Sequence, residues 1–229
     1  MTQSELAPAE NIRWMGLYKI GIVAALISLI LIPISMVAFF IWPPFPPDIL
    51  TVIQEDALAG LMSLDLLYLL GNFFGIPLFL VLFVTLKRVD DSWALIALAL
   101  GFIGLVCIVL ARPILEMLAL SDQYTAASAT DKATYLAASE AILSLFHGTA
   151  FHTHYLLGSA SLLISSCLML GSDIFGKATA RVGIVTNIVV FGLYVPVIGV
   201  YLSLLSVVGY LIWYALIARS LLRLVHGSS

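Results

Sequence analysis

The stretch LYKIGIVAALISLILIPISMVAFFI, residues 17–41, decides the class of this protein. Lys19 is the one charged residue of this stretch. The stretch is longer than the roughly 20 apolar residues that a helix needs to cross a bilayer. The proline-rich run at residues 42–47 cannot continue a helix, so the span ends there. Because the apolar core of a cleaved signal peptide is only about 7–15 residues long, we expect a retained transmembrane helix.

Similar apolar stretches recur along the chain. Hydrophobic residues make up 62% of its 229 residues and charged residues only 10%, more apolar surface than a water-soluble domain could bury. We therefore expect an all-α fold: one domain over residues 1–229, a polytopic helical bundle in the membrane. Residues 48–59 and 133–146 predict one or two short helices on the outer surface. The six predicted spans are residues 17–41, 60–86, 93–111, 151–171, 182–200 and 203–222.

The positive charges predict the orientation of this bundle. Of the ten Lys and Arg residues, all except Arg112 and Lys132 lie at the termini or in alternate connections. The positive-inside rule then places both termini in the cytoplasm. The net charge of −3 is small, and no basic cluster indicates a nucleic-acid partner. The expected partner is the lipid bilayer. The remaining eight basic residues are Arg13, Lys19, Lys87, Arg88, Lys177, Arg181, Arg219 and Arg223.

One carboxylate lies inside a predicted span. On a continuous helix over residues 60–86, the spacing of Asp65, Tyr68 and Asn72 puts them on one face. An ionised carboxylate in the bilayer costs about 2.5–3.5 kcal/mol, so Asp65 should face protein or water, or be protonated. Its expected partners are Arg112 and the histidines that begin the span 151–171. Asp65 then either binds a ligand or pins neighbouring helices together.

A second group of polar residues surrounds Gly148. On an unbroken helix Glu140, His147 and His154 recur every seven residues and share one stripe, whereas His152 points nearly the opposite way. If Gly148 and Thr149 break the helix, His147 folds back toward His152 or His154. Either geometry can gather imidazoles and a carboxylate, which are ligands that zinc favours, although no HExxH motif is present.

Most polar candidates fall near one predicted depth. Arg112 and Glu116, four residues apart, can form a local ion pair at the end of the span 93–111. Together with Asp65, Tyr68 and Asn72 they make up the predicted ligand-binding set. The inner half of the bundle has no comparable group, and so we expect a cavity that opens outward.

Small residues predict where helices approach closely. Gly71 and Gly75 form a GxxxG motif, and Gly158, Ser161 and Ser165 give the span 151–171 a series of small side chains.

Two short segments carry a resemblance to known proteins. The segment LDLLY at residues 64–68 and the segment GYLIWY at residues 209–214 resemble an uncharacterised family of prokaryotic six-span membrane proteins, catalogued as a domain of unknown function. The resemblance implies a six-helix fold in a prokaryotic cytoplasmic membrane and no particular activity. A looser similarity links the chain to intramembrane zinc hydrolases of the ceramidase and adiponectin-receptor type, which usually have seven spans.

Three functions compete on these observations. The leading hypothesis is a non-enzymatic protein that binds a lipid or other small apolar ligand in an outer-half cavity, or that serves as an accessory subunit of a membrane complex. The first alternative is an intramembrane zinc hydrolase with Asp65 as its catalytic residue and the histidines as metal ligands. The second alternative is a proton-coupled transporter of small molecules in which Asp65 titrates.

Overall fold

The computed structural model describes residues 3–227, and all regular structure in that range is helical. Five helical segments are long and apolar enough to cross a membrane: Ile12–Ile41, Leu66–Leu86, Asp91–Ala126, Lys132–Gly171 and Gly199–Gly227. The chain is therefore compatible with an integral membrane protein, as the apolar stretches predict. The elements are α1 (Gln3–Ile41), α2 (Ile49–Glu55), α3 (Ala57–Ser63), α4 (Leu66–Phe73), α5 (Gly75–Leu86), α6 (Asp91–Leu110), α7 (Ile114–Ala126), α8 (Lys132–Leu143), η1 (Ser144–His147), α9 (Thr149–Leu168), η2 (Met169–Gly171), α10 (Lys177–Phe191), η3 (Gly192–Tyr194) and α11 (Gly199–Gly227).

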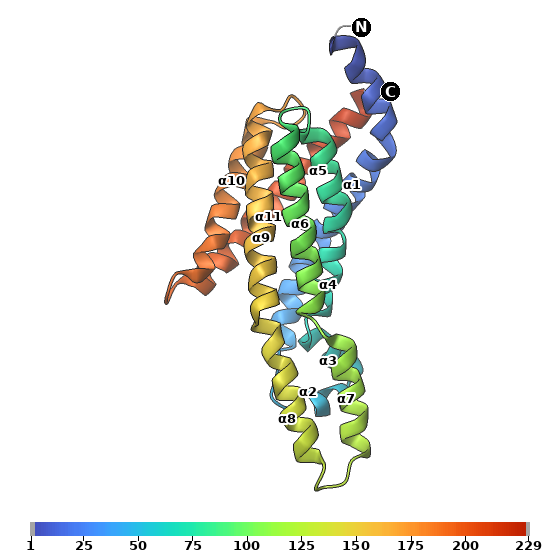
Figure 1. The fold of residues 1–229 in the computed structure, drawn as a ribbon, viewed down its shortest axis with the longest axis vertical. Coiled ribbons are helices and arrows are strands. Elements are labelled where there is room, and N and C mark those ends of the chain that lie inside the picture. The colour runs from blue at the N-terminus through green and yellow to red at the C-terminus, as the bar shows by residue number, and fades with distance from the viewer. Residues whose placement is uncertain (1–2, 228–229) are drawn as a thin grey trace. The chain divides into compact units, whose positions relative to one another are not determined.

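These elements form two compact units (Figure 1). Unit 1 comprises three segments: the described chain up to Ile30, Phe74–Ile103, and the described chain from Leu156 onward. Unit 2 takes Leu31–Phe73 and Gly104–Tyr155. The single domain over residues 1–229 stays a prediction.

Glycine and serine positions bring the helices of unit 1 close together. Ser161 on α9 donates a hydrogen bond to the backbone oxygen of Ala97 on α6, and Ser165 is buried on the same helix. The predicted small-residue contact of this span is thus confirmed at Ser161, whereas the Ser165 hydroxyl donates within its own helix. Gly183 on α10 packs where an added Cβ would overlap Ser166 of α9 and Trp213 of α11. Small side chains therefore set the approach of three helices.

The basic residues are concentrated in unit 1. The connections α5–α6 and α9–α10 lie at the same end of this unit as the start of α1 and the last turns of α11 (Figure 1). Of the basic residues in unit 1, Arg13 and Lys19 lie in the first half of α1, and the others lie in these connections, in the helix turns that adjoin them or in the last turns of α11.

Unit 2 has an apolar core of its own. Ile49, Leu50 and Ile53 of α2 are at most 5% exposed and pack against Met117 of α7 and Phe146 of η1. The predicted short helix at 48–59 is therefore two helices, α2 and α3, and α2 is a core element. The predicted helix at 133–146 is confirmed as α8 and η1, which follow α7 in a helical hairpin (Figure 1). We did not predict α7 from the sequence.

The predicted boundaries were wrong at two spans. The span 60–86 is interrupted at Leu64 and Asp65, because Asp65 has a φ of 61°, which no α-helix accommodates. Within the predicted span 182–200, α10 ends at Phe191 and is followed by η3. The chain then turns at residues 195–198, and α11 begins at Gly199. Pro196 has no N–H to continue a helix, and Val197 has a φ of 70°. The predicted spans 17–41, 93–111 and 151–171 agree with the helices within two residues at one end or both, and the predicted span 203–222 lies inside the longer helix α11.

Candidate functional site

Asp65 lies at the break between α3 and α4, not on a helix face. Its backbone N–H donates to Met62 and its carbonyl accepts from Leu69, so the chain turns sharply there without losing its hydrogen bonds. Aspartate tolerates the left-handed conformation better than most residues. The predicted shared helix face of Asp65, Tyr68 and Asn72 is therefore wrong for Asp65, which precedes the first residue of α4, Leu66.

Arg112 is the partner of Asp65. Its Nη2 donates to Asp65 Oδ2 at 2.9 Å, and its Nη1 donates to the carbonyl oxygens of Ala111 and Phe146, each at 3.0 Å. Arg112 is only 5% exposed. The predicted Asp65–Arg112 pairing is confirmed, whereas Glu116 is exposed and does not take that place. The pair ties the start of α4 to the residues between α6 and α7 and to η1.

Four aromatic rings surround the Arg112 guanidinium. The centroids of Phe45, Tyr68, Phe146 and Phe151 lie 5.2–5.7 Å from its central carbon, a set that we call the aromatic box. Rings within about 6 Å attract a guanidinium through their negative faces. The Nε atom of Arg112 has no hydrogen-bond partner among the described residues. The rings thus occupy positions where a water-exposed arginine would be hydrated.

Tyr68 and His154 form a second polar connection inside unit 2. His154 Nδ1 lies 2.9 Å from the carbonyl oxygen of Gly104, which can only accept, so Nδ1 carries the proton. In the neutral imidazole Nε2 is then an acceptor, and the Tyr68 hydroxyl donates to it at 3.0 Å. Asn72 donates to the backbone oxygen of Tyr68, which stabilises its own helix. The hydrogen bonds of His154 and Asn72 are therefore made to other groups of the protein.

The remaining metal-ligand candidates are not brought together. Glu140 and His152 are exposed, and the ring of His147 packs edge-on against Phe45 and Phe151. The helix breaks at Gly148, so the seven-residue stripe of Glu140, His147 and His154 does not form. Among the described side chains, those of residues 12–227, no three from His, Cys, Asp or Glu are close enough to hold one metal ion. The three-ligand arrangement that a zinc hydrolase requires is thus not assembled here.

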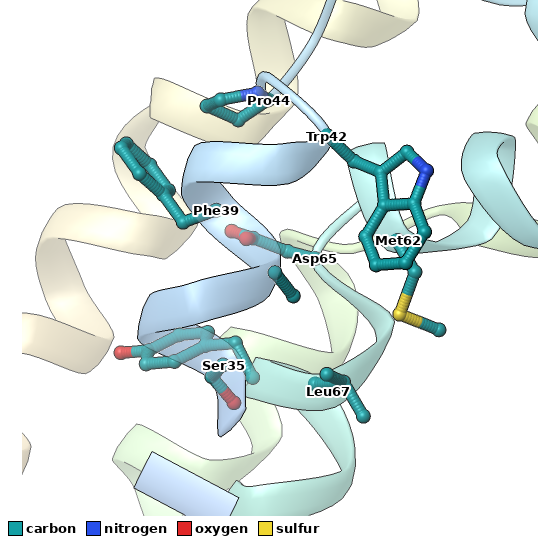
Figure 2. A pocket seen from close by; sticks show the side chains of 9 residues that line it. Ser35, Phe39, Trp42, Pro44, Met62, Asp65 and Leu67 are labelled. Carbon is teal, nitrogen blue, oxygen red and sulfur yellow. The ribbon is translucent and has the colours of Figure 1, made fainter. Parts of the chain in front are cut away.

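A small pocket opens beside the ion pair (Figure 2). One side comes from Ser35, Ala38 and Phe39 in the last turns of α1 and from Trp42, the residue that follows the helix. Asp65 contributes a carboxylate to the pocket, and its side chain is 25% exposed. In Figure 2 this carboxylate points in the direction of Phe39. The other lining residues are Pro44, Met62, Leu67 and Tyr68.

Sequence reasoning missed the residues that enclose the ion pair. Phe45 is one of them: it has a φ of 55°, and its N–H donates to the carbonyl oxygen of Ser63. This contact folds the proline-rich run back over the ion pair. The only signal in the sequence was the aromatic composition of residues 39–45, which is also typical of a membrane interface.

No family model, curated protein or solved structure matches this chain. The resemblance to the uncharacterised prokaryotic family stays a prediction, and the site has to be interpreted from its own chemistry.

Proposed function

We propose that this protein is a six-span integral membrane protein that binds a small, largely apolar ligand in the pocket beside Asp65. In this proposal both termini lie in the cytoplasm of a prokaryotic cell, and no catalytic step is assigned. The observation that carries it is the carboxylate of Asp65, one oxygen of which is held by Arg112 while the side chain faces an aromatic pocket. Ligand pockets commonly combine apolar walls with a few positioned polar groups.

Helix lengths support the sixth crossing. With 15 residues in α10 and 3 in η3, this arm of the α10–α11 hairpin spans roughly 28 Å at 1.5 Å and 2.0 Å per residue. The hydrocarbon core is about 30 Å thick, and so a slightly thinned bilayer accommodates the arm. An even number of crossings agrees with the basic residues at one end of unit 1.

The Asp65–Arg112 pair favours binding over proton transfer. Two hydrogen-bonded carbonyls and four rings hold Arg112 in place, so the carboxylate has a permanent cationic partner. A titrating carrier needs a carboxylate that alternates between charged and neutral forms, which such a partner opposes.

The test is the recovery of ligand from the purified protein. Ala38 is 7% exposed and lines the pocket, so Ala38→Phe should fill it, whereas Val37→Phe adds a ring at a position that is 58% exposed. Both variants and the wild type are extracted from membranes in mild detergent, and bound lipids are measured by mass spectrometry against protein amount. We expect a near-stoichiometric species in the wild type and Val37→Phe that is lost in Ala38→Phe.

Equal lipid content in all three proteins would overturn the proposal. Because Ala38→Phe overpacks a buried site, its folding is checked by size-exclusion profile, and Trp42→Ala serves as a second pocket variant that removes a wall instead.

A further inference from the structure

The pocket offers two polar groups to a ligand. Asp65 Oδ2 accepts from Arg112, while Oδ1 accepts no hydrogen bond from the side chains of residues 12–227. Ser35 also lines the pocket, and its hydroxyl makes no hydrogen bond to the described residues. The Tyr68 hydroxyl is already engaged as a donor to His154. A carboxylate is an acceptor only, so the ligand must donate at Asp65.

The charge balance of the site selects against charged ligands. Arg112 neutralises Asp65 and lies 5.5 Å from the ring of Tyr68, which is itself a wall of the pocket. An ammonium head placed at Asp65 would therefore stand close to a buried guanidinium. An anionic head would meet the carboxylate. In a medium of low dielectric constant both like-charge contacts are costly, which leaves a neutral donor.

The apolar tail of a bound ligand can extend out of the same pocket. Phe39 lines it and is 49% exposed, and Phe40, which is 72% exposed, packs edge-on against the Phe39 ring. A chain attached to a head at Asp65 can leave past Phe39 and lie along the apolar side of α1.

We propose that the ligand is a lipid with a neutral hydroxyl head, whose O–H donates to Asp65. This inference rests on the proposed function and narrows it to one class of ligand. An alcohol can donate to Asp65 and also accept a hydrogen bond from Ser35. An ether can only accept, so it can bind Ser35 but not Asp65. The preference for an alcohol over its methyl ether therefore measures the contact with Asp65.

The experiment uses three photoreactive twelve-carbon probes that differ only in the head: an alcohol, its methyl ether and the primary ammonium. Each carries a diazirine four carbons from the head. They are added to the full-length protein in phosphatidylcholine nanodiscs, because phosphatidylcholine has no hydroxyl donor. Labelled peptides that cover residues 31–45 and 61–73 are quantified in wild type, Ala38→Phe and Val37→Phe.

We expect the alcohol to label these peptides about tenfold more than the ether in wild type and Val37→Phe, as the loss of one hydrogen bond to a charged group implies. Ala38→Phe should abolish the difference. Equal labelling by alcohol and ether, both lost in Ala38→Phe, would overturn the hydroxyl inference and leave the binding pocket standing. Ammonium labelling as strong as that of the alcohol would overturn the neutral head. Labelling that is indifferent to Ala38→Phe would contradict the proposed function itself.

Discussion

At the scale of the residue, Arg112 is the most constrained side chain of unit 2. It is almost fully buried, it donates three hydrogen bonds, and the aromatic box surrounds its guanidinium. A buried ion pair adds little stability relative to apolar residues of the same size, but removing one partner leaves an uncompensated charge. The two residues should therefore behave as one unit.

The first prediction concerns this coupling. Asp65→Ala should lower the free energy of unfolding by about 3–5 kcal/mol, because the Arg112 charge remains buried without its carboxylate. Asp65→Ala combined with Arg112→Met should recover most of that loss. The strain of alanine at a φ of 61° is common to both variants and cancels in the comparison.

The measurement is unfolding in mixed micelles, followed by tryptophan fluorescence. A double variant that is less stable than Asp65→Ala, with the two losses adding up, would contradict this view of the pair.

At the scale of the element, glycines differ in what they do for packing. Gly71, half of the predicted GxxxG motif, has no atom within 4 Å of the place where its Cβ would be. It therefore provides no close helix contact. Gly183, which no motif marked, faces Ser166 and Trp213 at overlapping distance. The second prediction uses this contrast.

Gly183→Ala should destabilise the protein by about 1–3 kcal/mol, because Trp213 is fully buried and cannot move aside without displacing α11. Gly71→Ala is the matched control and should be neutral or slightly stabilising, since alanine is the better helix former. The check is thermal unfolding of both variants in the same detergent. Equal midpoints would show that the α9–α10–α11 packing is looser than described.

Some of the helix ends and contacts could be predicted from the sequence, and others could not. Helix ends at residues 42–47 and at Pro113 followed from proline chemistry, and the Asp65–Arg112 pair followed from the cost of an isolated charge in a membrane. The break at Asp65 did not, because a left-handed aspartate is held by tertiary contacts, here with Arg112. The aromatic box and α7 were missed for the same reason: apolar residues near a predicted interface carry no information on whether they face lipid or a core.

At the scale of the whole molecule, the distribution of positive charge should match its insertion. The third prediction is made in a background where Cys107 and Cys167 are replaced by serine. Val197→Cys, at a position that is 94% exposed in the α10–α11 turn, should react with an impermeant maleimide added outside intact cells. Asp173→Cys, in the exposed α9–α10 connection, should react only after the cells are opened.

This pattern is expected because Lys177 and Arg181 follow Asp173 and favour the cytoplasm. Labelling of Val197→Cys only in opened cells would mean that α10 does not cross. Labelling of Asp173→Cys from outside would reverse the orientation.

The pairing of Asp65 with Arg112 also has a consequence for biosynthesis. The two residues are 47 positions apart, and at 5–20 residues per second the ribosome needs roughly 2–10 s to pass from one to the other. Throughout that interval Asp65 has been synthesised and its counter-charge does not yet exist. The nascent chain must therefore keep the α3–α4 break near the aqueous boundary, or in the insertion machinery, until α6 has been made. Unit 2 is thus completed late, after Arg112 and then α7 and η1 have been made and can pack with α2.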